Sequence, residues 1–256
     1  MFMIDSYEDK LKNFKKLIEE SKKIVFFGGA GVSTSSGIPD FRSANGLYNN
    51  VDEDFKNYLP EELLSAGCFN HSPKVFYKFY RKYLDARKYE PNIVHKTLAK
   101  WEQDEKLIGI VTQNIDMLHE KAGSKKIYKI HGTIGKNHCI QCGETYDIDY
   151  VFDNKELLPH CCKCNGNYNL VKPNVVLYDE VLPKMELQGA ENVIAQADLL
   201  IIAGTSLMVE PAASLVKYYF GKNMVILNMT NTPYDKYADV VFHEDMSKVF
   251  EDLQKI

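Results

Sequence analysis

This sequence has no excess of basic residues, no long apolar run and few arginines. The 31 lysines and arginines are outnumbered by 35 aspartates and glutamates, which gives a formal net charge of −4. Surfaces that bind nucleic acid or anionic membranes are usually basic, so we expect neither partner. The longest apolar stretch, LLIIAG at 199–204, is much shorter than the roughly 20 residues of a membrane-spanning helix.

The amino terminus also lacks the basic-then-apolar pattern of a secretory signal, so we expect a cytoplasmic protein. Apolar residues make up 45% and charged residues 26%, which is typical of a globular protein with a core, and we expect a monomer. Only three of the 31 basic residues are arginine (Arg42, Arg81 and Arg87), a bias typical of an AT-rich bacterial genome. Lysine cannot reproduce the planar fork of arginine, which makes Arg42 notable.

Short apolar runs alternate with helical patterns along most of the chain. The strand-like runs are 23–28, 107–112, 127–131, 174–178, 198–204 and 223–229. The helical patterns are 7–22, 91–102, 183–197 and 209–219. This alternation predicts an α/β fold, a Rossmann-like parallel sheet with helices on both faces.

Two segments interrupt the alternation and predict a second, smaller domain. Residues 51–89 are rich in Tyr, Phe and Lys and mostly helical in pattern, with Pro60 and Pro73 at first-turn positions. Residues 138–170 hold five of the six cysteines. We expect a Rossmann-like domain formed by 1–46, 90–135 and 171–256, and a small domain formed by a helical module, 47–89, and a cysteine-rich module, 136–170. A cleft between two such lobes is the expected place for a ligand.

The cysteines form two C-x2-C pairs, Cys139 with Cys142 and Cys161 with Cys164, separated by eighteen residues. This spacing is typical of a zinc ribbon, and four thiolates leave no open position on the metal. The sequence therefore predicts one structural zinc ion. Disulfides are the alternative, which a cytoplasmic location disfavours.

A glycine-rich loop, GGAGVSTSSGIPDFRSANG at 28–46, follows the first strand-like run. Glycines after a strand let backbone N–H groups approach a pyrophosphate, although such a loop can also be only a turn. The G-x-G-x-x-G spacing of dehydrogenases fails, because Thr34 stands where the third glycine belongs. No clear acidic residue follows at the ribose position either, so an ordinary dehydrogenase fits poorly.

Polar residues follow four of the strand-like runs. They are TQNID at 112–116, His131 with Gly132, GTSL at 204–207, and Asn228. Singly, His131 could be a packed histidine, Asp116 a helix cap and Asn228 a turn residue. Because the carboxyl ends of parallel strands meet at one edge, where open α/β sheets bind ligands, all four together indicate a site.

With these motifs in order along nearly the whole chain, the sequence resembles the sirtuins, NAD-dependent protein-lysine deacetylases. The matching stretches are GAGVSTSSGIPDFR, TQNID-x-LH-x-x-AG, HG, the paired C-x2-C motifs, KPNVVLYDE and GTSL-x-V-x-PA, followed by the Asn228 strand. The resemblance implies that NAD is a co-substrate, that acetylated lysine in extended protein segments is the substrate, and that nicotinamide and O-acetyl-ADP-ribose are the products.

The resemblance also assigns roles to residues. His131 would be the general base that takes a proton from a ribose hydroxyl, for which an imidazole is suited near neutral pH, and Asn114 would place ribose and water. The residues expected to line the cofactor are Ala30, Thr34, Phe41 and Arg42. Those of the nicotinamide pocket are Asp40, Gln113, Asn114, Ile115 and Asp116. Those of the adenosine half are Thr205, Ser206 and Asn228.

By the same resemblance, the substrate peptide adds as a strand between 175–180 and 207–211. Met208 and Val209 are expected to line this groove, although simple apolar packing would explain them equally. Three positions depart from the family pattern: Gly28 stands for the usual threonine, Lys172 for arginine and Asp179 for glycine. Asp179 puts a charge beside the groove, which affects peptide preference rather than catalysis.

The acyl preference is predicted from a helical stretch, FYKFYRKY. Relatives that remove succinyl or malonyl groups carry a Tyr-x-x-Arg pair, whereas here Tyr80 is followed at that spacing by Tyr83. An acidic acyl group would lack a cation, at a cost of several kcal/mol. Arg81 would project about 100° from Tyr80 on a helix. We expect deacetylation, also of longer uncharged acyl groups, and poor desuccinylation.

Three other functions remain open on the sequence. A mono-ADP-ribosyltransferase would use the same NAD site with another acceptor. A non-catalytic NAD sensor built around a zinc ribbon would not need both His131 and Asn114. A zinc-ribbon nucleic-acid binder is disfavoured by the negative net charge.

Overall fold

The six strands of the main sheet are all parallel and have the order β3-β2-β1-β7-β8-β9. The structure is a computed structural model and describes residues 6–166 and 168–256. The strands are β1 (Ile24–Gly28), β2 (Leu107–Thr112), β3 (Ile127–Lys129), β7 (Leu199–Ala203), β8 (Asn223–Leu227) and β9 (Val240–Phe242).

Strands β1 and β7 lie side by side at the centre of this sheet, and all five residues of each are buried. Such strands are covered on both faces, which is why their sequences are continuously apolar. From β1 the chain adds β2 and β3 on one side, and it later places β7, β8 and β9 on the other. The reversal between β1 and β7 creates the crevice in which open α/β sheets bind ligands.

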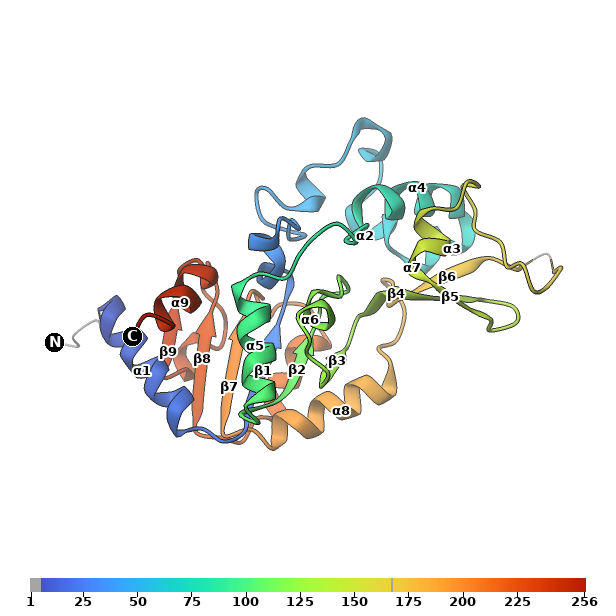
Figure 1. The fold of residues 1–256 in the computed structure, drawn as a ribbon. Helices are drawn as coiled ribbons and strands as arrows, with labels where there is room; N and C mark the ends of the chain where they lie inside the picture. Colours follow the sequence, from blue (N-terminus) through green and yellow to red (C-terminus); the bar gives the residue numbers. More distant parts are fainter. Residues whose placement is uncertain (1–5, 167) are drawn as a thin grey trace.

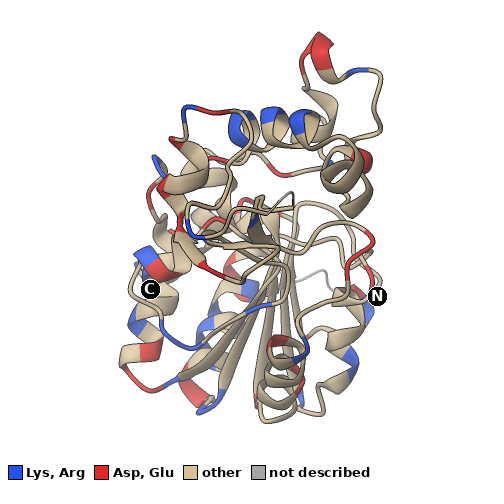
Figure 2. Cartoon of the chain, turned by 90° about the vertical axis from the view of Figure 1, so that its right-hand side faces the viewer, with Lys and Arg blue, Asp and Glu red and all other residues tan. Residues whose placement is uncertain are grey.

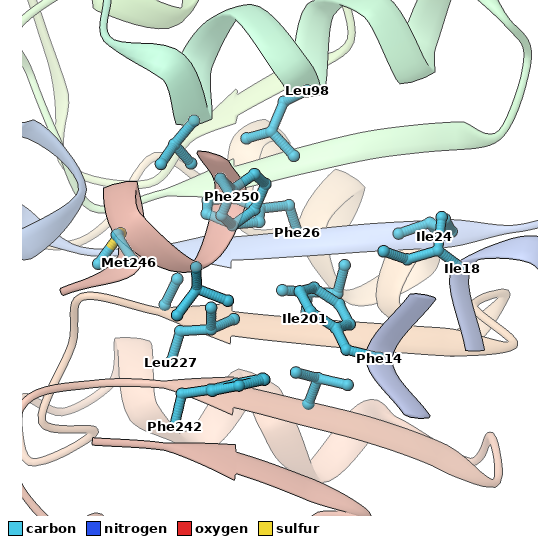
Figure 3. Close-up of a cluster of buried hydrophobic side chains, with 14 of the residues drawn as sticks. Phe14, Ile18, Ile24, Phe26, Leu98, Ile201, Leu227, Phe242, Met246 and Phe250 are labelled. Atoms are coloured by element: carbon cyan, nitrogen blue, oxygen red, sulfur yellow. The ribbon is translucent and has the colours of Figure 1, made fainter. Parts of the chain in front are cut away.

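Helices cover both faces of the sheet (Figure 1). One face packs against α1 (Tyr7–Glu20), α5 (Ile93–Gln103) and α9 (Met246–Leu253), and Figure 3 shows side chains of these helices meeting those of the strands. The other face packs against α8 (Lys184–Ala195) and the 3-10 helix η4 (Ala212–Tyr218). The predicted α/β fold with two covered faces is therefore confirmed.

Helix α1 illustrates how the sequence builds this packing. Ser6 caps its amino end by accepting a hydrogen bond from the Asp9 N–H. Leu11, Phe14 and Ile18 then recur at three- and four-residue spacing on one buried face. This face packs into the same core as strands β1, β7, β8 and β9.

A smaller lobe lies beyond one end of the sheet (Figure 1). Its antiparallel sheet has the order β5-β4-β6, formed by β4 (Gly132–Cys139), β5 (Thr145–Asp147) and β6 (Val171–Val175). Its helices are α2 (Pro60–Leu63), α3 (Ala66–His71), α4 (Pro73–Tyr83) and α7 (Ile148–Phe152). Pro60 and Pro73 are the first residues of α2 and α4, as predicted. Residues of the helical and cysteine-rich modules share one hydrophobic core.

The remaining elements are short. They are α6 (Leu118–Lys121) and four 3-10 helices, η1 (Ala30–Ser36), η2 (Leu47–Asn49), η3 (Glu53–Phe55) and η5 (Asp235–Tyr237).

Two predicted elements differ in the structure. The apolar run 174–178 does not join the parallel sheet: β6 covers Val171–Val175 and pairs antiparallel with β4, because the chain leaves the cysteine-rich module beside it. Residues 209–219 were predicted as an α-helix, whereas a 3-10 helix begins after Pro211. Strand β9 and helix α9 were not predicted.

Figure 2 shows basic and acidic residues interspersed along the ribbon of both lobes. Among the described residues, no helix combines the length and the apolar character that crossing a membrane requires.

Candidate functional site

The glycine-rich loop crosses directly over the end of β7. The Gly29 N–H donates to the Ala203 carbonyl at 3.0 Å and the Gly31 N–H to the Gly204 carbonyl at 2.9 Å. A Cβ atom on Gly29 would lie 2.7 Å from the Gly204 oxygen, and one on Gly31 2.7 Å from the Gly204 Cα. Glycine is therefore required at both positions by the contact between loop and strand. The loop then continues as η1.

Ser33, Asn114 and Asp116 form a hydrogen-bonded group between η1 and the segment that follows β2. The Ser33 hydroxyl donates to Asp116 Oδ2 at 2.6 Å and accepts from Asn114 Nδ2 at 3.1 Å. The other Asp116 oxygen accepts the Leu118 N–H at 2.9 Å. Burial raises the pKa of Asp116, and these two hydrogen bonds act in the opposite direction. The group holds two loops of the crevice at a fixed separation.

A cavity opens beside this group, between the glycine-rich loop and the helical module. Five of the predicted site residues line it: Ala30, Phe41, Asn114, Ile115 and Asp116. The walls contributed by the helical module are mostly apolar or aromatic, namely Leu47, Tyr83, Leu84, Asp85, Ala86 and Tyr89. Such a cavity suits a flat ring with one polar group, because apolar walls surround a few convergent polar side chains.

His131 lies just after β3, where its ring is fixed by the chain beside it. Its Nδ1 lies 3.1 Å from the Gln113 carbonyl oxygen, which can only accept a hydrogen bond. Nδ1 therefore carries the proton, which leaves Nε2 of the neutral ring free to accept one. Burial and the positive charge of Arg42 lower the pKa of His131, whereas the Gln113 carbonyl raises it. The ring is thus held in its neutral, basic form near pH 7.

The residues predicted for the adenosine half, Thr205, Ser206 and Asn228, follow strands β7 and β8. Thr205 Oγ1 accepts a hydrogen bond from Gln113 Nε2 at 3.0 Å, and Ser206 next to it is exposed. Asn228 follows β8, and its N–H donates to the Phe242 carbonyl of β9 at 3.0 Å.

Thr34 and Asp40 lie outside the cavity, in a second depression next to it. Asp40 Oδ1 accepts the Arg42 N–H at 3.1 Å and the Ser43 N–H at 2.8 Å, so it shapes the loop. Arg42 is half-exposed and lies close to Glu61.

Two residues next to the predicted site have a left-handed backbone. Met117 and Leu207 have φ angles of 67° and 54°, and both follow polar segments at the carboxyl ends of strands. Residues other than glycine rarely adopt this left-handed backbone conformation. Where they do, it is often at a functional site. Asp179, which stands where the family usually has glycine, also has a left-handed backbone, with φ 71°.

The four predicted cysteines converge in the small lobe. The sulfur atoms of Cys139, Cys142, Cys161 and Cys164 all lie within 4.8 Å of one another. Two of these pairs are 3.7 Å and 3.6 Å apart, far beyond a disulfide bond and close to the about 3.7 Å expected around tetrahedral zinc.

Donors around these sulfurs also fit a metal-bound thiolate cluster. Backbone N–H groups of Gln141 and Lys163 point at Cys139 and Cys161, and the Tyr146 hydroxyl donates to the Cys161 sulfur at 3.0 Å. The cysteines are therefore positioned to bind one zinc ion.

Two residues of the site were missed from the sequence. Ser33 was quoted within the glycine-rich loop, but its hydroxyl received no role, although a serine followed by small residues could have suggested one. Tyr178 donates to or accepts from Tyr48 at 3.0 Å and accepts from Arg42 at 2.9 Å. No sequence signal indicates these contacts, because they join segments far apart in the chain.

Comparison with known proteins gives consistent matches. A model of the Sir2 family matches residues 29–211. A Clostridium acetobutylicum protein named NAD-dependent protein deacetylase is 46% identical over 243 residues, which cover 95% of this chain and 97% of that protein.

Solved structures agree over a similar extent. A structure described as Sir2 bound to acetylated peptide has a TM-score of 0.83 at 32% identity and covers 96% of this chain and 97% of that chain. A structure described as Sir2 with a p53 peptide and NAD+ has a TM-score of 0.83 at 33% identity, with 96% of this chain and 97% of that chain covered.

Proposed function

Since the chain belongs to the Sir2 family, we propose that it removes acetyl groups from protein lysine side chains in an NAD-dependent reaction. The products are nicotinamide, the free lysine and O-acetyl-ADP-ribose. One observation carries the proposal: the His131 ring is held through Nδ1 by the carbonyl of Gln113, the residue that precedes Asn114 of the cavity wall, which leaves Nε2 free to accept a proton. When bound, NAD would supply a sugar carbon that accepts the acetyl oxygen, while the bond between that carbon and nicotinamide would break.

His131 acts in this proposal as the general base. Its Nδ1 proton is directed at the Gln113 carbonyl, so Nε2 receives the proton that a sugar hydroxyl loses. The lowered pKa keeps the ring neutral and ready to accept a proton at pH 7, at some loss of basicity. Asn114 is held by Ser33 and orients water and sugar beside the cavity.

The other site residues are proposed to hold NAD. The cavity lined by Ala30, Phe41, Asn114, Ile115 and Asp116 would receive the nicotinamide ring. Thr34, Asp40, Arg42 and Gln113 border this region, while the adenosine half would lie along Thr205, Ser206 and Asn228. The four-cysteine cluster would hold zinc with no ligand position free, so the metal stabilises the small lobe and takes no part in the reaction.

Acetylated peptide is proposed to bind as an extended strand between 175–180 and 207–211. A relative of known structure is described as bound to acetylated peptide, which supports this substrate class. The exposed side chain of Met208 lies in the second of these segments, where it would contact the peptide. Backbone pairing of this kind makes few demands on sequence.

The acyl preference follows from the contacts of α4. Tyr80 is fully buried and stacks between Phe76 and Phe152. Arg81 donates to the Asn154 carbonyl of the cysteine-rich module at 3.1 Å. We propose that neither side chain pairs with an acidic acyl group. We predict efficient removal of acetyl and propionyl groups and at least about tenfold slower removal of succinyl.

The decisive experiment incubates the protein with NAD and one peptide carrying acetyl-, propionyl- or succinyl-lysine, followed by mass spectrometry. We expect equal amounts of deacetylated peptide, nicotinamide and O-acetyl-ADP-ribose. Covalent ADP-ribose on protein without deacetylation would instead identify an ADP-ribosyltransferase. Binding of NAD without release of nicotinamide would identify a non-catalytic NAD sensor.

A further inference from the structure

The Arg42 guanidinium is held by residues from three separate parts of the chain. It donates from one terminal nitrogen to the Tyr178 hydroxyl oxygen at 2.9 Å. Its central carbon lies 5.6 Å from the centre of the Tyr48 ring, and Glu61 of α2 lies 3.8 Å away. Because half of the Arg42 side chain is exposed, the ion pair with Glu61 contributes little by itself. The hydrogen bond to Tyr178 is the directional contact.

The two tyrosine hydroxyls reinforce each other. Tyr178 and Tyr48 lie 3.0 Å apart, oxygen to oxygen, so one donates to the other. Burial, and then the hydrogen bond with Tyr178, raise the pKa of Tyr48 well above its usual range, so its hydroxyl stays neutral. The Tyr178 oxygen can therefore accept from Arg42 while the pair shares a second hydrogen bond.

The backbone of Tyr178 is itself anchored on both sides. Its N–H donates to the Leu64 carbonyl at 2.9 Å, and its carbonyl accepts the Ala66 N–H at 2.9 Å. Two residues earlier, the Val176 N–H donates to the His131 carbonyl at 2.9 Å. The segment 176–178 thus runs as a fixed strap from His131 to the helical module, and the Tyr178 side chain extends from it to the glycine-rich loop.

We propose that Tyr178 is a positioning residue, whose hydroxyl fixes the Arg42 guanidinium and so links the segment beside the peptide groove to the loop over the NAD site. This inference rests on the proposed function, which identifies the two ligands as NAD and acetylated peptide. It adds a residue that acts on NAD binding through Arg42 rather than by touching the reacting atoms.

Arg42 also acts on His131. It is the charged group that lowers the pKa of the imidazole, after the larger effect of burial. The groups that face Arg42 itself are Tyr178, Tyr48 and Glu61.

The test is Tyr178→Phe, which keeps the ring and removes only the hydroxyl. Loss of a hydrogen bond to a half-exposed charged group predicts about fivefold weaker NAD binding by titration calorimetry and an equal rise in KM for NAD. The kcat at the optimal pH stays within about twofold, because the base and the cavity are unchanged.

Two further variants make the test specific. Tyr48→Phe removes the partner hydroxyl but no direct bond to Arg42, so it produces a smaller change in the same direction, and the double variant is less than additive. Tyr58→Phe removes a hydroxyl from an exposed tyrosine of the same lobe and leaves NAD affinity unchanged.

Wild-type NAD affinity in Tyr178→Phe would overturn the inference, as would a change confined to KM for the peptide. Should Tyr178→Phe not fold, wild-type NAD affinity in Tyr48→Phe would likewise overturn it. Failure of the proposed function is separate, because the wild-type protein would then form no O-acetyl-ADP-ribose at all.

Discussion

The parallel sheet and the small lobe are stabilised in different ways. Strands β1 and β7 are buried along their whole length, and helices close a continuous apolar core on each face. In the small lobe, β5 is mostly exposed, and the core is formed by aromatic residues of α4 together with the cysteine cluster. We therefore expect the sheet to be stable by itself and the small lobe to depend on the metal.

Removal of the metal should produce the largest difference in stability between the parallel sheet and the small lobe. Cys139→Ser, or a chelator, should release zinc and unfold the small lobe, because structural zinc contributes about 10–16 kcal/mol of apparent binding free energy. Trp101, the single tryptophan, lies on α5 against Phe250 and reports on the large core. We expect its fluorescence to stay native while hydrogen exchange in β4–β6 becomes fast.

The matched control for this experiment is Cys162→Ser. Cys162 is exposed and is not one of the four converging cysteines, so the variant should retain one zinc per chain. Simultaneous loss of the Trp101 signal and of the small lobe would show that the two parts unfold as one unit.

A cavity in the core of the parallel sheet should have the next largest effect on stability. Phe26 of β1 is completely buried, so Phe26→Ala should lower the free energy of unfolding by about 3–5 kcal/mol. Phe220→Ala, at a side chain that is 78% exposed, should change it by less than about 0.5 kcal/mol. Urea unfolding followed by Trp101 fluorescence measures both. Equal effects would contradict the burial pattern.

Acid should also act on the large part, through two buried histidines. Burial lowers the pKa of His95 to about 2 and that of His119 to about 4. Both stay neutral in the folded protein while the unfolded chain takes up protons below about pH 6.5, so stability falls as the pH drops below that value. The slope is about 1.4 kcal/mol per pH unit for each group.

Urea unfolding at pH 7, 6 and 5, followed by Trp101 fluorescence, measures this slope. His119→Phe should reduce it, because one titrating group is removed while the ring that packs against Phe26 is kept. An unchanged slope in this variant would exclude His119 as a source of the acid sensitivity.

The smallest predicted effect is at Asp179, beside the small lobe. Its φ of 71° is a conformation that glycine adopts without strain, so Asp179→Gly should stabilise the protein by about 0.5–1 kcal/mol. Glu105→Gly, at φ 60° next to β2, is the matching change in the large part. Thermal unfolding of both variants measures the gain, and a lower midpoint for Asp179→Gly would contradict it.

The sequence predicts the large part better than the small one, for physical reasons. Buried parallel strands such as β1 and β7 require continuous apolar runs, which are visible in a single sequence. Strand β9 has only three residues, too few for a pattern. The pairing of β6 with β4 joins the two ends of the cysteine-rich module, and periodicity cannot show which sheet a run joins. Over two turns, the apolar positions of η4 fit a 3-10 helix as well as an α-helix.

The residues of the site also divide into those that the sequence predicts and those that depend on how distant segments pack. His131, Asn114 and Asp116 were predicted because they end strands of one parallel sheet, and such ends converge at one edge. The contacts of Tyr178 with Arg42 and Tyr48 could not be predicted, since they depend on how the small lobe is placed against the glycine-rich loop.

The central claim is that the His131 imidazole accepts the proton in deacetylation. The most direct measurement compares wild type, His131→Ala and the surface variant His71→Ala in the rate of O-acetyl-ADP-ribose formation at saturating NAD and acetylated peptide. We predict a loss of at least about 100-fold for His131→Ala alone, with zinc content and thermal midpoint close to wild type. A rate in that variant within a few-fold of wild type would contradict the account.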